Sequence, residues 1–321
     1  NTVVLDSGLS NTTTTKDSID IEAVNYSLSN DNVSIQFSNY GARIDQVTML
    51  NYKTHDSLPL DLITDFDFDL KFDINGQIIH TNQLYFIADD SDLNKLKFYW
   101  EDDNKNSITL IYQLLDGYQL TCDVLTNVND SRNSFVEPLN LMVTQQVNQL
   151  EKHLDTERST TTIKYCLSNN DVSQMPLMRD KQKMINEKVY WVAHRQQFFS
   201  TIFSSEESFN AVDLAVSTPE SDRYVRTLTS NFEFVDKGNS SLSFDLYFLP
   251  NKYSLLQSFE KDFESLVPLG WGIFGWVNKW LIIPMFNILE KWGLNYGLII
   301  LIIAFVIKML LFLPTKSSYL S

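Results

Sequence analysis

Residues 294–313, close to the C-terminal end of the sequence, form an almost purely apolar run, although the formal net charge is −15. About twenty such residues give a helix the length it needs to cross a hydrocarbon core of roughly 30 Å. We therefore predict a transmembrane helix over 293–316, with a cytoplasmic region beginning at 317–321. Lys316 lies at the far end of this run and the acidic body precedes it. Because positive charge marks the cytoplasmic end of a span, the body is expected outside the cytoplasm.

One lysine, Lys308, lies within the predicted span, about two-thirds of the way across. A charge at this depth costs free energy unless it reaches water or a partner. The side chain can snorkel to the cytoplasmic interface, because its aliphatic stem is long. It can also face a hydrated cavity inside a helix bundle and serve a substrate there. The residues alone leave both interpretations open.

A second apolar segment, 270–292, precedes the span and holds four of the six tryptophans of the chain. Lys279, Asn287 and Glu290 fall on a narrow polar stripe of a helix with 3.6 residues per turn. Tryptophan favours the headgroup level of a bilayer, since its ring is apolar and its N–H needs a polar partner. We therefore predict an interfacial amphipathic helix; the alternative is a core helix covering a sheet. The predicted anchoring residues are Trp271, Trp276, Trp280 and Trp292.

Alternation of apolar and polar residues dominates 31–250 and predicts many short strands. The segment 107–125 is typical of a hairpin folded over Asp116-Gly117. Strands in this number favour a mainly β fold, a large sandwich. Residues 1–30 are predicted to be a polar, disordered lead-in. Apolar residues at helical spacing predict a linker helix over 251–269.

Composition and motifs narrow the function. An acidic body without a basic patch argues against nucleic acid as a partner. No metal-spaced, phosphate-loop or hydrolase motif is present, so we predict no catalytic residues, no metal and no cofactor. Cys122 and Cys166 either pair or remain separate buried thiols. Asp65, Asp67 and Asp69 are expected on the wet face of a strand, with a carboxylate catalytic pair as the alternative. His194, Gln196 and Gln197 are expected to satisfy one another in a half-buried strand, with a ligand site as the alternative.

The C-terminal segment resembles the second transmembrane helix of the YidC/Oxa/Alb family of membrane protein insertases. The family pattern is Asn-Trp-Gly, an apolar run, a basic residue, Phe-Pro-Leu-Thr-Lys and Tyr-x-Ser. Tyr296 replaces its tryptophan, and Leu313-Pro314 reverses its Pro-Leu order. Segments FDLYFLPNKYSLL, WVAHRQQFF and VSIQFSNYGARIDQVTMLNYKTHDSLPLDL are also similar, in the style of Bacteroidetes members. The matching positions are Asn295, Gly297, Phe312, Thr315, Lys316, Tyr319 and Ser321.

The resemblance implies a periplasmic β-supersandwich of the galactose-mutarotase-like kind, an interfacial helix and a span of a multi-pass protein of the bacterial inner membrane. It implies a hydrophilic groove in which one basic residue, here Lys308, attracts the polar tail of an inserting protein. Lysine keeps the charge of the usual arginine but not its planar fork. The implied partners are nascent membrane proteins, the lipid bilayer and Sec translocon components, without covalent chemistry.

Two other functions are considered. A membrane-anchored carbohydrate-binding or mutarotase-like periplasmic protein would need a His and a Glu facing one cleft, with His194 as the best candidate base. An extracytoplasmic scaffold would instead dock other translocation components through the β domain. Hexose binding in a cleft would distinguish the first, and crosslinking to a translocon channel the second.

Overall fold

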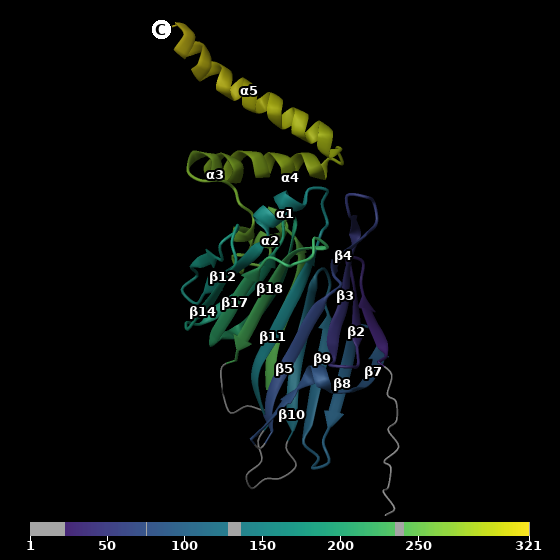
Figure 1. Ribbon diagram of the computed structural model, residues 1–321. Helices are drawn as coiled ribbons and strands as arrows, with labels where there is room; N and C mark the ends of the chain where they lie inside the picture. The colour runs from purple at the N-terminus through teal and green to yellow at the C-terminus, as the bar shows by residue number, and fades with distance from the viewer. Residues whose placement is uncertain (1–22, 75, 128–135, 235–240, 321) are drawn as a thin grey trace, which may run out of the picture.

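The computed structural model describes residues 23–74, 76–127, 136–234 and 241–320, without the side chains of 136–139, 311 and 313–320. Nineteen strands in this part of the chain form three sheets with antiparallel neighbours. Figure 1 shows an elongated β body with the α-helices gathered at one end. The mainly β fold predicted from alternation is confirmed.

The described strands are β1 Asn25–Ser29, β2 Val33–Ser38, β3 Arg43–Lys53, β4 Pro59–Ile63, β5 Phe66–Ile74, β6 Gln77–His80, β7 Ile87–Asp92, β8 Lys95–Glu101, β9 Ser107–Leu114, β10 Gln119–Asn127, β11 Val136–Asn148, β12 Thr162–Leu167, β13 Val172–Gln174, β14 Lys181–Ile185, β15 Val189–Arg195, β16 Phe199–Phe209, β17 Ala211–Ser217, β18 Tyr224–Glu233 and β19 Ser241–Pro250. The described helices are η1 Thr81–Gln83, α1 Leu154–Thr160, α2 Tyr253–Gln257, η2 Phe263–Leu266, α3 Ile273–Val277, the π-helical η3 Asn278–Ile282, α4 Ile283–Lys291 and α5 Tyr296–Leu320.

The sandwich consists of a nine-stranded sheet on one side and two sheets, of six and four strands, on the other. The nine-stranded order is β13-β12-β15-β16-β19-β10-β9-β8-β7, and the six-stranded order is β14-β17-β18-β11-β5-β6. The four-stranded sheet β1-β2-β3-β4 adjoins the six-stranded one, because β3 contacts β5 and β4 contacts β11. The predicted hairpin is present: β9 pairs with β10 across a turn in which Gly117 has a φ of +89°. Only glycine adopts that conformation at little cost.

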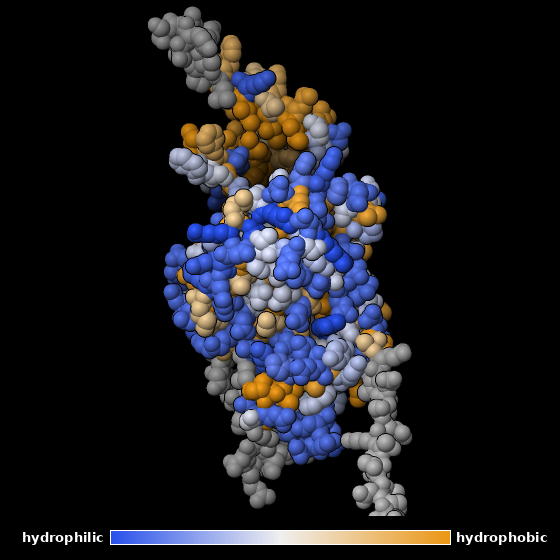
Figure 2. All heavy atoms as spheres, viewed as in Figure 1, coloured by the Kyte–Doolittle hydropathy of each residue, from blue (hydrophilic) through white to orange (hydrophobic). Residues whose placement is uncertain are grey.

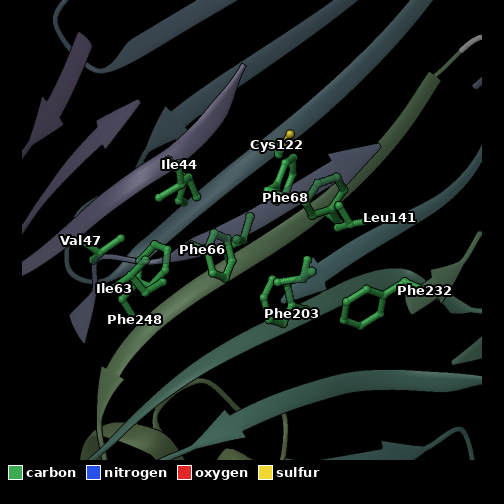
Figure 3. Close-up of a cluster of buried hydrophobic side chains, with 14 of the residues drawn as sticks. Ile44, Val47, Ile63, Phe66, Phe68, Cys122, Leu141, Phe203, Phe232 and Phe248 are labelled. Carbon is green, nitrogen blue, oxygen red and sulfur yellow. The ribbon is translucent and has the colours of Figure 1, made fainter. Parts of the chain in front are cut away.

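An aromatic layer fills the space between the sheets, as Figure 3 shows. Phe66 of β5 stacks on Phe203 of β16, with ring centroids 6.3 Å apart and planes 7° apart. Phe203 also packs on Phe232 of β18, and Phe68 faces Phe244 of β19. All of these rings are buried. Each buried aromatic removes roughly 150–250 Å² from water, so this layer is a main source of the sandwich's stability.

A buried polar bridge also crosses the two layers. His194 of β15 is fully buried, and its ring nitrogens lie 3.1 Å from Gln145 Oε1 of β11 and 2.8 Å from Ser230 Oγ of β18. Burial lowers the pKa of His194 to about 3. The structural role predicted for His194 is present, but its glutamine partner is Gln145 rather than Gln196 or Gln197.

Two sequence predictions need correction, one on the lead-in and one on Asp69. The lead-in boundary at residue 30 is too late, because β1 begins at Asn25 and buries Leu28 opposite Ile35; residues 1–22 lie outside the described part. Asp69 is not on a wet face: its buried carboxylate lies 2.7 Å from His80 Nδ1 and accepts a bond from the Asn82 N–H. The open question on the cysteines is answered, since Cys122 and Cys166 are separate buried thiols.

The single linker helix predicted over 251–269 is instead two short helices, α2 and η2. Glu260 and Asp262 between them adopt left-handed φ values of 56° and 60°, which no continuous α-helix contains. The Trp191 indole N–H donates to the Lys261 carbonyl at 2.8 Å, and this bond holds the break in place. Tertiary packing therefore overrides the helical spacing of the apolar residues.

The helices α3, η3 and α4 run on from one another and lie across the end of the β body (Figure 1). Helix α5 then departs from α4 and leads away from the sheets. Figure 2 shows that hydrophobic residues gather over these helices, above a mostly hydrophilic body. Within the described part of the chain, no helix combines the length and apolar content that crossing a bilayer requires. The transmembrane helix predicted over 293–316 stays a prediction.

The buried histidine predicts a loss of stability in acid. The unfolded chain protonates His194 near pH 6.5, whereas the folded chain does so only near 3, so the unfolded state binds more protons between these values. The free energy of unfolding falls as pH drops through this window, by about 2–3 kcal/mol between pH 6.5 and 4.5 for this group. Thermal unfolding in a mild detergent, at several pH values, gives the slope of the free energy of unfolding against pH for the wild type and for His194→Gln.

Glu157 provides the control, because its contribution has the opposite sign. Burial raises the pKa of the Glu157 carboxyl to about 7, although it accepts bonds from the Leu150 N–H. The amount by which Glu157 lowers the free energy of unfolding therefore grows as pH rises from about 4.5 to 7. Glu157→Gln should steepen the loss of stability in acid, and His194→Gln should flatten it. Equal slopes in all three proteins would contradict this assignment.

Candidate functional site

The apolar surface of the terminal helices is the feature of the chain that most requires a function. Trp271, Trp276, Trp280 and Trp292 are 63–86% exposed. Exposed apolar patches of more than a few hundred Å² mark protein or membrane contacts in soluble proteins. The patch continues along α5 with further large exposed side chains, namely Leu298, Ile300, Leu301, Phe305, Met309, Leu310 and Phe312.

A small hydrophobic cluster joins α4 to α5 and sets the angle between them. Leu289 of α4 is buried with Ile299 and Ile303 of α5, and Phe286 stacks on Tyr296 with planes 11° apart. The turn between the helices depends on Gly293, whose φ is +72°. The Asn295 side chain then accepts a bond from the Leu298 N–H at 2.9 Å and caps α5.

Lys308 lies on a part of α5 that no other described element covers. Its side chain is exposed, and it forms no ion pair within the described residues. The helix beyond the Ile299 and Ile303 contacts leads away from the body (Figure 1). The structure therefore presents Lys308 on an apolar helix surface rather than in a cavity of this chain.

An ion pair connects the body to α4, and we call this contact the Lys252–Glu290 link. Lys252 follows β19, and its Nζ donates to both Glu290 carboxylate oxygens at 2.9 and 2.8 Å. The ammonium lowers the pKa of the Glu290 carboxyl. The Tyr296 hydroxyl donates to Glu290 at 3.2 Å, so body, α4 and α5 meet at one carboxylate. Glu290, predicted as part of the polar stripe, therefore faces the body.

A sugar-active site around His194 is not supported by the geometry. The imidazole has no exposed surface, and its two nitrogens are occupied by Gln145 and Ser230. A general base must come within hydrogen-bond reach of a substrate proton, which this position does not allow. The contact between the buried Asp69 carboxylate and the half-buried His80 ring was not predicted, because the two residues are brought together by the β5–β6 hairpin.

Comparison with known families decides the identity. Residues 25–286 match the model of the YidC periplasmic domain. The chain belongs to this family. The YidC match covers the whole sandwich and continues through α3 into α4, so the family includes the segment that carries three of the exposed tryptophans.

Curated YidC relatives are similar over most of the chain. The chain is 32% identical over 312 residues to the membrane protein insertase YidC of Parabacteroides distasonis, covering 92% of this chain and 49% of that protein. It is 29% identical to the YidC of Amoebophilus asiaticus, with 92% and 52% covered. The chain therefore spans about half the length of these relatives.

Solved structures with a similar fold are more distant. A galactose mutarotase-like protein from Lactobacillus casei has a TM-score of 0.48 at 9% identity, covering 71% of this chain and all of that one. A galactose mutarotase related enzyme from Lactobacillus acidophilus has a TM-score of 0.43 at 11% identity, covering 70% and 97%. These values support no statement about sugar chemistry in this YidC-family chain.

Breaking the Lys252–Glu290 link should loosen the orientation of α4 relative to the body and have little effect on the stability of the protein. Because both groups are partly exposed, Glu290→Gln should change the free energy of unfolding by less than about 1 kcal/mol. The distance distribution between spin labels at Lys95 and Ile288 should broaden in this variant. Exchanging the charges, with Lys252→Glu and Glu290→Lys together, should narrow it again. A distribution that is unchanged in Glu290→Gln would contradict the link's role.

Proposed function

We propose that the chain is the periplasmic domain, interfacial helix and first following span of a membrane protein insertase of the bacterial inner membrane. The observation that carries the proposal is the exposed tryptophan-rich surface attached to a YidC periplasmic domain. The names of the relatives, membrane protein insertase, agree with it. In this proposal the body is periplasmic, and the full-length protein crosses the membrane several times.

The distribution of charge supports this orientation. Residues 270–321 carry four lysines and one glutamate, a net charge of +3, which leaves −18 on the rest of the chain. The charged side chains of the acidic body are stabilised by water, whereas the terminal helices expose mainly apolar side chains. We place 270–292 in the plane of the interface and 293–316 across the bilayer. Gly293 provides the sharp turn between the two directions.

Insertion in this proposal needs no covalent step and no cofactor. The Lys308 ammonium would attract the acidic or polar tail of a nascent membrane protein, inside a groove completed by spans outside this chain. A hydrated groove lowers the cost of moving polar groups across the membrane. Burial of the client's apolar segment in lipid then drives the reaction forward. Sec translocon components are the further partners proposed for this function.

Tryptophan fluorescence tests the interfacial placement. In vesicles with brominated lipids, the four tryptophans of 270–292 should be quenched most strongly by bromines near the headgroups, because indole favours that level. Replacing these four by Phe should remove most of the quenching. Replacing Trp100 of the body should leave it unchanged, since Trp100 lies on β8 of the sandwich. Quenching that is strongest at the bilayer centre would contradict the placement.

Lys308 is tested in the full-length protein by an insertion assay in proteoliposomes. Lys308→Ala should reduce insertion of clients with acidic tails by about tenfold, the equivalent of one lost charge-assisted interaction. Lys308→Arg should retain activity, because the charge is kept.

The matched control is Lys279→Ala, which removes an exposed lysine from the preceding helix rather than from α5. It should leave insertion unchanged. If Lys308→Ala inserts every client as well as the wild type does, Lys308 only snorkels and has no role in insertion.

A further inference from the structure

A cavity of about 400 Å³ lies where the sandwich meets α4 and α5. Its walls come from β3, β4 and the β15–β16 turn on the body side, and from α4 and α5 on the other. Sites for small molecules have volumes of roughly 300–1,000 Å³. The cavity is thus large enough for a ligand, and it is formed only when the body and the helices are together.

Two aromatic pairs line the cavity, one from each side. Tyr52 packs edge-on against Phe199 of the body, with ring centroids 5.2 Å apart. Phe286 and Tyr296 stack on the helical side. Phe198, a large apolar side chain in the same wall, is half exposed. Aromatic rings of this kind bind the aliphatic and cationic parts of a ligand.

Charges of both signs complete the walls. The Lys252–Glu290 link is internally paired, but Lys53 and Glu151 form no ion pair within the described residues. Lys53 is exposed and Glu151 is partly buried. The cavity therefore offers one unpaired cation and one unpaired carboxylate, which together complement a ligand that carries both a negative and a positive group.

We propose that this cavity binds the headgroup of an aminophospholipid, phosphoethanolamine, from the outer leaflet of the membrane. Lys53 holds the phosphate, and Glu151 accepts hydrogen bonds from the ammonium. The inference rests on the proposed membrane location, because the cavity adjoins the helices placed there. Phe286 and Tyr296 belong to those helices, so the acyl chains of the bound lipid can continue along them into the bilayer.

Native mass spectrometry of the delipidated full chain in detergent tests the proposal. Phosphatidylethanolamine, phosphatidylcholine and phosphatidylglycerol with identical acyl chains are added separately, and the dissociation constant of the first bound lipid is measured. Phosphatidylethanolamine should bind most tightly, since choline has no N–H to donate to Glu151. Lys53→Met and Glu151→Gln should each weaken its binding by about tenfold, whereas Lys95→Met on β8 should not change it.

Soluble competitors distinguish a headgroup site from a phosphate site. Excess glycerophosphoethanolamine should displace the lipid, and inorganic phosphate at the same concentration should not. Equal displacement by phosphate, equal affinity for the three lipids, or no effect of either substitution overturns the proposal. Vesicle flotation tests the membrane location separately from the lipid site. Lys53→Met should float with the membrane as the wild type does. Failure of the wild type to float would instead overturn the proposed function.

Discussion

Packing of aromatic rings between the two layers is the interaction on which the rest of the structure depends. The rings come from β5, β16, β18 and β19, which are far apart in the sequence, so the layer forms only when both sheets are assembled. The bonds that join His194 to Gln145 and Ser230 fix the same layers in one register. Buried polar groups of this kind are stable only when each partner is satisfied.

Contacts with the β body determine where the chain leaves the sheets. The rings of Trp191 and Tyr247 enclose Phe263 of η2, and the Lys164 ammonium and Arg195 guanidinium donate to the carbonyls of Ser265 and Leu266. Burial lowers the pKa of Lys164 to about 8. These contacts anchor the segment before α3 from two sides. In the described part of the chain, α4 contacts the body through the Lys252–Glu290 link and beside the adjoining cavity. Most of the large apolar side chains of the terminal helices stay exposed.

Much of the fold could be predicted from the sequence, because alternation and turn residues are local signals. The hairpin at Asp116-Gly117 and the exposed tryptophans follow from such signals. The strand β1 could not be predicted, since it has few apolar residues and is stabilised by its pairing with β2. The break at Glu260–Asp262 depends on a bond from Trp191, which lies 70 residues away. The lining of the cavity joins five stretches of the chain, 52–60, 151, 198–199, 250–252 and 286–296, and leaves no sequence motif.

The central claim is that the terminal helices lie in the membrane, with 270–292 at the interface and 293–316 crossing the bilayer. Thiol accessibility in the full-length protein tests this claim directly, using single-cysteine variants at Val24, Phe305 and Leu320 with Cys122 and Cys166 replaced by Ser. In intact cells with a permeable outer membrane, an impermeant reagent should label position 24, leave 305 unlabelled, and reach 320 only after the inner membrane is opened. Labelling of 305 or 320 in intact cells would contradict the account.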